Sequence, residues 1–98
     1  MAKQTYPTMK VTKNKTSLAA LFASHGVEAP LGEVQFELQN ASSHDVFVSY
    51  GDQAKLENDA GHPIPPFWKA NELESFENVY IKSGLGLGAS KIVVSVVS

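Results

Sequence analysis

Asn78 to Val97 reads NVYIKSGLGLGASKIVVSVV, and this stretch decides the fold. Two runs in it, Val79 to Ser83 and Lys91 to Val97, are rich in valine and isoleucine. Such residues fit the pleated surface of a sheet and lose rotamer freedom in a helix. The segment between the runs, Ser83 to Ser90, is punctuated by glycine. The pattern predicts a terminal β-hairpin at the centre of an all-β domain.

Two further strands are indicated upstream. In Glu33 to Gln39 apolar and polar residues alternate, a period of two that is typical of a strand with one face in the core. Asp45 to Tyr50 is predicted as the next strand and as its antiparallel neighbour. Val46 and Val48 are then expected to face the core, and Phe47 is expected on the opposite face.

Residues 17–25 carry the helical signal of the chain. Leu18, Leu21 and Phe22 recur at helical spacing, and Thr16 or Ser17 can cap the N-terminus. A helix of about two turns is too short to be stable alone. We therefore expect its apolar face to dock on the sheet or on a neighbouring chain.

The middle of the chain, Gln53 to Phe76, has a weaker pattern. Ala54 to Leu56 is predicted as a short strand, and Glu72 to Glu77 as a short strand or turn. The three prolines between residues 63 and 66 require an extended, non-helical path. Phe67 and Trp68 follow them and are expected to anchor that path to the domain or to a partner.

About seven short strands, one short helix and frequent turn signals predict a small antiparallel β-sandwich or barrel. At 98 residues the chain has room for one core, so we expect one domain over residues 16–98 and an N-terminal arm over residues 1–15. The arm contains no acidic residue and four lysines, Lys3, Lys10, Lys13 and Lys15. It is either a basic arm that reaches an acidic neighbour, or a solvated arm with an edge strand around Thr8 to Lys13.

Composition excludes several classes of function. The net charge is −2 and the chain has no arginine, which argues against a dedicated nucleic-acid-binding protein. The absence of cysteine removes disulfides, thiolate nucleophiles and cysteine-based metal sites. No apolar run approaches the roughly 20 residues that span a bilayer, and the polar N-terminus does not resemble a signal peptide. We expect no membrane partner.

The glycine-rich segment Gly84-x-Gly86-x-Gly88 invites comparison with loops that cradle phosphate. Such a loop leads into a helix, whose N-terminus binds the anion. Here the next element is a predicted strand, so we expect a flexible hairpin loop instead. Leu85 and Leu87 are unusual in a solvated loop, and exposed apolar residues often make contacts. They are therefore candidate interface residues.

The remaining polar residues show no catalytic or metal-binding constellation. Three histidines lack the spacing of a metal motif and are expected at the surface: His25, His44 and His62. A solvated acidic edge, which can also meet the lysines of another subunit's arm, is expected from Glu72, Glu74 and Glu77. We expect no enzymatic activity, no cofactor and no metal.

The last strand is apolar on both faces. Ile92, Val94 and Val96 share one face, while Val93 and Val97 share the other with Ser95. A strand of this kind is usually buried on both sides. The second face is then covered by the N-terminal segment and helix, or by another protein chain.

Four pieces follow one another in a set order along the chain. They are a strand ending in Asn40-Ala41-Ser42-Ser43, the strand Val46-Phe47-Val48-Ser49-Tyr50-Gly51, the turn Ile64-Pro65-Pro66, and the strand Val79-Tyr80-Ile81, which leads into a Ser/Gly loop and a valine-rich last strand. This order resembles that of small virion proteins from tailed bacteriophages, over about two-thirds of the chain. Lys69 to Phe76 departs from the pattern, and the first 32 residues carry no resemblance.

The resemblance implies a capsid decoration, or cement, protein. Such a protein is a non-enzymatic β-sandwich, made in the host cytoplasm, that binds the outer surface of the head as a trimer or another small homo-oligomer. Its partners would be the major capsid protein or other virion proteins. The contact residues we expect are Lys3, Lys10, Lys13, Lys15, Phe47, Phe67, Trp68, Leu85 and Leu87.

Two alternatives remain open. One is a tail, neck or fibre-attachment protein of the same kind of particle. The other is a carbohydrate- or receptor-binding module, in which Trp68, Tyr50 and Tyr80 stack on a sugar.

Overall fold

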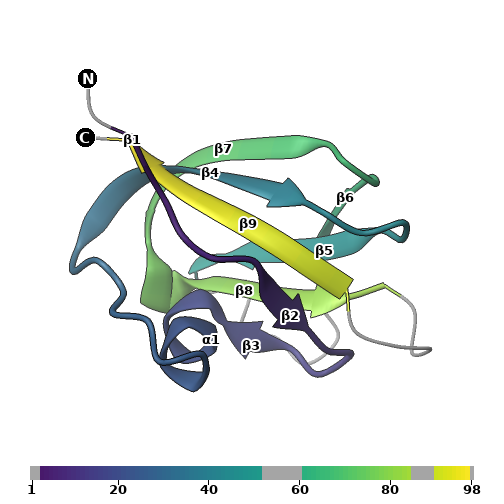
Figure 1. The fold of residues 1–98 in the computed structure, drawn as a ribbon, viewed down its shortest axis with the longest axis horizontal. Coiled ribbons are helices and arrows are strands. Elements are labelled where there is room, and N and C mark those ends of the chain that lie inside the picture. The colour runs from purple at the N-terminus through teal and green to yellow at the C-terminus, as the bar shows by residue number, and fades with distance from the viewer. Residues whose placement is uncertain (1–2, 52–60, 85–89, 98) are drawn as a thin grey trace.

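A computed structural model of the chain describes residues 3–51, 61–84 and 90–97. They form two antiparallel β-sheets, which pack face to face around one core (Figure 1). The prediction of a small antiparallel β-sandwich with one short helix is confirmed. Nine strands are present in these ranges, against about seven expected, because the short strands at residues 3–5, 16–17 and 62–64 had no clear sequence signal.

The first sheet contains five strands. Its order is β1 (Lys3–Thr5), β9 (Ser90–Val97), β4 (Glu33–Asn40) and β7 (Lys69–Ser75), and β2 (Met9–Val11) pairs with β9 beside β1. β1 and β2 thus form one interrupted edge strand along β9. The other edge of this sheet is β7.

The second sheet contains four strands. Its order is β3 (Thr16–Ser17), β8 (Val79–Ser83), β5 (Val46–Tyr50) and β6 (His62–Ile64). The segment Ala54 to Leu56, for which a strand was predicted, lies outside the described residues.

The predicted terminal hairpin is wrong. Both strands exist, but β8 lies in the second sheet and β9 in the first, so they do not pair with each other (Figure 1). The ends of the two strands are joined by a buried hydrogen bond between the hydroxyls of Ser83 and Ser90, 2.8 Å apart. Each strand is central in its own sheet, flanked on both edges by other strands, and this explains the apolar sequences that suggested a hairpin.

The same correction applies to β4 and β5, which were expected to be antiparallel neighbours. The chain crosses between sheets after Asn40, so β4 pairs with β9 and β7, and β5 pairs with β8 and β6. The predicted faces of β5 are confirmed, because Val46 and Val48 are buried and Phe47 lies on the other face. Alternation determines which residues face the core, but it carries no information about which strand is adjacent.

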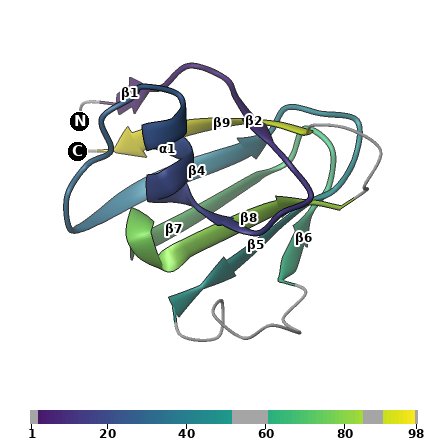
Figure 2. The same ribbon diagram turned by 90° about the horizontal axis from the view of Figure 1, so that it is seen from below.

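The helix α1 (Leu18–Ser24) packs against β2, β3, β8 and the 3₁₀ turn η2 (Phe76–Asn78) (Figure 2). The Ser17 hydroxyl caps it by accepting from the Ala20 N–H at 3.1 Å. Its Phe22 ring makes edge contacts with Tyr6 and Phe76, at centroid distances of 4.8 and 5.2 Å. The helix therefore fills the side of the sandwich between β2 and β8.

The two faces of β9 have different surroundings. Ile92 and Val94 are fully buried in the core, while Val93 and Val97 on the outer face are half-buried. Ser95, between them, accepts or donates a 2.9 Å hydrogen bond with the hydroxyl of Thr5 on β1. β1, β2 and β4 lie beside β9 in the same sheet, and α1 packs against β2, β3, β8 and η2.

Candidate functional site

The most exposed aromatic side chains in the described part of the protein are adjacent in sequence. Phe67 is 66% exposed and Trp68 is 67% exposed, on the turn between β6 and β7. Large apolar side chains at such exposure are typical of interaction sites when they lie together. This pair, the aromatic turn, was predicted as an anchor, and the structure presents it to solvent.

The backbone holds the aromatic turn in an unusual conformation. Phe67 has a φ of 66°, a region that a bulky residue occupies at a cost of about 1–3 kcal/mol. Three backbone hydrogen bonds hold it there: the Phe67 N–H donates to the Asn40 carbonyl at 2.8 Å, the Asn40 N–H to the Trp68 carbonyl at 3.0 Å, and the Trp68 N–H to the Pro65 carbonyl at 3.1 Å. The two aromatic residues are therefore fixed to the end of β4.

The side chain of Asn40 completes this support. It is fully buried, and its Nδ2 donates to the carbonyls of His44 at 2.6 Å and Ile64 at 2.8 Å. Its Oδ1 accepts from the backbone N–H of Ser42 at 3.0 Å and from the Ser42 hydroxyl. Sequence reasoning placed Asn40 at the end of a strand and assigned it no supporting role. An asparagine at the end of an alternating strand, followed by small polar residues, is the signal that was available.

One arm lysine is bound to the domain itself. Lys3 Nζ lies 3.3 Å from Glu37 Oε1, and Lys69 Nζ lies 3.2 Å from the same oxygen. Burial would raise the pKa of Glu37, but the hydrogen bonds from Lys69 and Lys3 outweigh it and lower that pKa below its ordinary value. Lys3 thus meets an acid of its own chain on the outer face of the first sheet.

The β7 edge combines an exposed leucine with two carboxylates. Leu73 is 60% exposed and lies opposite Gln35 in the register, on the outer face. Glu72 Oε1 accepts from the Leu73 N–H at 3.4 Å, and Glu74 Oε1 accepts from the Ser75 N–H at 3.0 Å. The carboxylates therefore bind N–H groups of their own strand, which disfavours pairing with a further strand.

The charge of Glu72 also affects Tyr50, which lies on the inner side of the sandwich. Tyr50 on β5 is partly buried, and burial together with the negative charge of Glu72 raises its pKa to about 12. Tyr50 lies opposite Val79, on the inner face of its sheet, whereas Tyr80 lies opposite Ser49 on the outer face. The three rings proposed for sugar stacking are therefore not brought onto one face.

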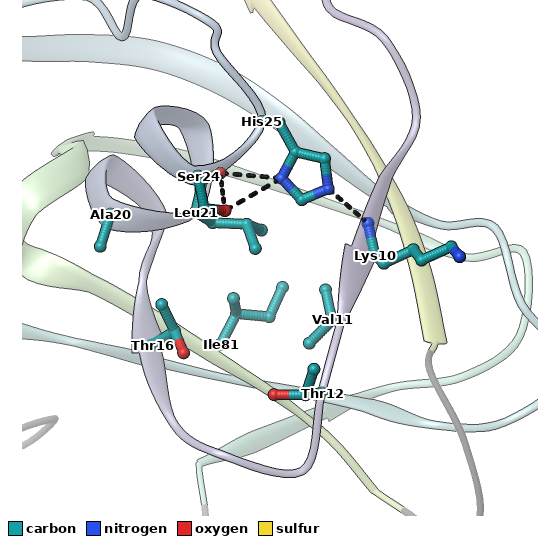
Figure 3. A pocket seen from close by; sticks show the side chains of 9 residues that line it. All are labelled: Lys10, Val11, Thr12, Thr16, Ala20, Leu21, Ser24, His25 and Ile81. Atoms are coloured by element: carbon teal, nitrogen blue, oxygen red, sulfur yellow. Dashed lines mark hydrogen bonds between the residues drawn. The ribbon is translucent and has the colours of Figure 1, made fainter.

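A pocket of about 330 Å³ opens between α1 and the strands β2, β3 and β8; we call it the α1–β2 pocket (Figure 3). Its apolar lining includes Val11, Leu21 and Ile81, all of them buried core residues. The rim is polar and consists of Lys10, Thr12, Thr16, Ser24 and His25, with Ala20 on the helix beside them. Nothing in the sequence pattern indicated this pocket, because it depends on how α1 packs beside β2.

His25 has a structural role at the rim (Figure 3). The Lys10 backbone N–H donates to its Nε2 at 3.3 Å, and its Nδ1 lies 2.9 Å from the Leu21 carbonyl, to which only a protonated Nδ1 can donate. The imidazole therefore satisfies an N–H at the edge of β2 and a carbonyl at the end of α1. In the described ranges no group of three histidine, aspartate or glutamate side chains is suited to hold a metal ion.

The other predicted contact residues are dispersed. Lys10 lies directly opposite Lys91 in the register of β2 and β9, and Lys13 lies exposed in the turn that follows. Lys15, further along, is partly buried and makes an interaction of its own. Lys3 is thus paired with Glu37 of its own chain, whereas Lys10 and Lys13 are exposed.

Phe47 lies half-buried on the outer face of the second sheet, between Lys82 and Pro63 in the register. Its ring packs against Gly84, where an added Cβ would be 2.7 Å from the ring. Leu85 and Leu87 lie outside the described residues. Phe47 therefore offers less free surface than the aromatic turn does.

None of the helices in the described residues is long and apolar enough to cross a membrane. No protein-family model matches the chain, and neither the curated proteins nor the solved structures with which it was compared contain a match.

Proposed function

We propose that this protein is a non-enzymatic structural subunit that attaches to a larger assembly through the aromatic turn. The observation that carries the proposal is the exposure of Phe67 and Trp68 on a turn held by a buried asparagine. Tryptophan and other aromatic residues are enriched among the side chains that dominate binding energy. A turn already held in place loses little conformational entropy when it binds, which favours affinity.

The assembly we propose is the head of a tailed bacteriophage, where the subunit would act as a decoration protein on the outer surface of the capsid. The sequence resemblance, which covers about two-thirds of the chain and includes the segment Val46 to Gly51, supports this choice. The partner would be the major capsid protein. Many equivalent contacts, each of modest strength, would then add up across the shell.

Binding to purified, undecorated capsid shells of the particle whose genome encodes the chain tests this proposal. We expect the protein to co-sediment with the shells in hundreds of copies per particle. Trp68 is the sole tryptophan, so its fluorescence emission should shift to shorter wavelength when the turn becomes buried. Trp68→Ala should weaken binding by at least about 10-fold, as expected for a central aromatic contact.

Two further variants separate binding from folding. Phe67→Gly removes an exposed ring and relieves the positive φ, so it should fold at least as stably as the parent and still bind shells more weakly. Leu31→Ala is the matched control, because Leu31 is 95% exposed and lies near the start of β4, away from the aromatic turn at its end. Its shell binding should be unchanged.

The number of copies bound per particle distinguishes a head protein from a tail or neck protein. Association as a single ring would instead indicate a tail, neck or fibre-attachment protein. A folded chain that ignores shells but binds glycans through Trp68 would replace the proposal with the carbohydrate-binding alternative. Shell binding that survives Trp68→Ala and Phe67→Gly would refute the role of the aromatic turn.

A further inference from the structure

We infer that the α1–β2 pocket binds a small uncharged molecule of two fused aromatic rings that carries one hydroxyl group. Such a ligand goes beyond the proposed function, which concerns the attachment of the chain to a larger assembly. The lining of the pocket, the hydrogen bonds of its rim and its volume each support this class of ligand.

The floor of the pocket is apolar and belongs to the core. Val11 from β2, Leu21 from α1 and Ile81 from β8 are 1%, 7% and 0% exposed, and their side chains point toward one another (Figure 3). Ala20 is an exposed lining residue on α1 and contributes only a methyl group. Pockets that bind small molecules are lined mainly by apolar side chains, with a few polar groups that orient the ligand. The α1–β2 pocket has this composition.

The rim disfavours a charged ligand. Lys10 is the one lining residue with a permanent charge, and its ammonium group points away from the pocket (Figure 3). Both ring nitrogens of His25 already have partners, the Lys10 backbone N–H and the Leu21 carbonyl. The Ser24 hydroxyl donates to the same carbonyl at 2.8 Å. A charged group in the pocket would therefore lose water without gaining a counter-charge, which is costly.

Two threonine hydroxyls of the lining have unused hydrogen-bonding capacity. A hydroxyl can donate one hydrogen bond and accept two. The Thr12 hydroxyl accepts from the Asn14 N–H at 3.3 Å, and its own proton is not donated to any described residue. The Thr16 hydroxyl donates to the Asn14 carbonyl at 3.1 Å and accepts no bond from a described residue. A ligand hydroxyl on this side of the pocket can accept from Thr12 or donate to Thr16.

The volume of the pocket limits the size of the ligand. It is about 330 Å³, about twice the roughly 150 Å³ of an apolar cavity that holds one benzene ring. Two fused rings therefore match the pocket. A rigid ring system also loses less conformational entropy on binding than a flexible chain of the same volume. These properties together describe a molecule such as 2-naphthol.

Titration of the full chain with 2-naphthol tests the inference. The methyl resonances of Val11, Leu21 and Ile81 should shift in proton–carbon correlation spectra, because these groups form the floor. We expect a dissociation constant below about 1 mM, an affinity within reach of a ligand of this size. 2-Naphthoate has the same rings with a negative charge and should bind at least about 10-fold more weakly. The flexible alcohol 1-octanol should also bind more weakly than 2-naphthol.

Filling the pocket should prevent binding. Ala20→Leu places a larger side chain in the lining and keeps a good helix former, so it should weaken 2-naphthol binding at least about 10-fold. Ala23→Leu is the matched control, because Ala23 is exposed on the same helix and lies outside the lining. Its affinity for 2-naphthol should equal that of the parent.

Removing the two hydroxyls tests the polar contact separately from the apolar floor. Thr12→Val together with Thr16→Val should weaken 2-naphthol binding about 3- to 10-fold, the loss expected for one hydrogen bond. Naphthalene has the same rings without the hydroxyl, so its binding should be unchanged in this double variant.

Three results would overturn the inference. One is the absence of 2-naphthol binding at about 1 mM, and another is binding to Ala20→Leu that is as tight as to the parent. The third is loss of 2-naphthol binding in Trp68→Ala, which would place the ligand at the aromatic turn. Shell binding is measured separately, so either proposal can fail alone.

Discussion

The amide of Asn40 shows how one residue can organise a surface. It lies at the end of β4, is fully buried, and has hydrogen-bond partners at both its nitrogen and its oxygen. Through these bonds it joins the turn after β4 to the end of β6, while its backbone holds the aromatic turn. The exposed residues Phe67 and Trp68 are therefore positioned by a residue that never touches solvent.

Replacing this amide should destabilise the protein. Asn40→Ala removes the amide donor from the carbonyls of Ile64 and His44, the second of which keeps only the 3.3 Å bond from the Ser42 hydroxyl. The expected cost is about 2–3 kcal/mol in the free energy of unfolding. Urea denaturation followed by circular dichroism measures this loss. Asn71→Ala on the exposed face of β7 is the control and should change stability by less than about 0.5 kcal/mol. Equal effects of the two substitutions would contradict the role of Asn40.

Tyr50 should make stability fall at alkaline pH. Its pKa is raised from 10.0 to about 12 in the folded protein, so between these values the folded state keeps a proton that the unfolded chain releases. Stability from this group is present below pH 10 and is lost as the pH rises toward 12. Urea midpoints at about pH 9 and about pH 11.5 should fall less in Tyr50→Phe than in the parent. An identical fall in both would disprove the effect.

At the scale of elements, the strand content follows from local patterns, while the pairing of strands does not. Ser17 as the cap of α1 and the alternation of β4 are readable from neighbouring residues, because both depend on contacts within a few positions. β8 and β9 show the opposite case. Their six-residue connection is compatible with a hairpin or with a crossing between sheets, and only the flanking strands decide between them.

Gly61 packs so closely against β5 that this position has no room for a side chain. Its φ is 79°, and an added Cβ would lie 2.7 Å from the Ser49 hydroxyl and 2.9 Å from the Val48 carbonyl. Gly61→Ala should therefore cost about 2–3 kcal/mol, the sum of backbone strain and a clash with the neighbouring strand.

Gly26 provides a matched comparison for this substitution. Its φ is 68°, but nothing lies within 4 Å of an added Cβ. Gly26→Ala should cost only about 1 kcal/mol, from backbone strain alone. Thermal unfolding of both variants measures the difference, and equal melting temperatures would contradict the clash.

At the scale of the whole molecule, the first residues are part of the sandwich. β1 and β2 pair along β9, so Lys3 lies opposite Val97 and the two ends of the described chain meet. Met9 and Val11 are each 1% exposed and belong to the core. The four lysines suggested a basic arm outside the domain, but the burial of these two apolar residues holds the segment in the sandwich.

Truncation shows which part of the N-terminal segment the fold requires. Removing residues 1–5 deletes the exposed strand β1 and should leave a folded protein, because an exposed ion pair such as Lys3–Glu37 contributes at most about 1 kcal/mol. Removing residues 1–11 also deletes two core side chains and the strands that pair with one edge of β9, which then pairs with β4 alone. That loss is comparable with the roughly 5–15 kcal/mol that stabilises a domain, so the chain should not fold. A cooperative thermal transition in the longer truncation would contradict this prediction.

The sequence by itself determined the class of fold, the position of the helix and the faces of the main strands. Each of these depends on alternation, capping or branching within a few residues, where chemistry acts locally. The exposure of Phe67 and Trp68 was open from sequence, since an aromatic pair after prolines fits the core as well as the surface. Only the tertiary structure decided that β8 and β9 lie in separate sheets, that Asn40 supports the aromatic turn, and that α1 and β2 enclose a pocket. These features arise from contacts between residues far apart in the chain, which no local pattern specifies.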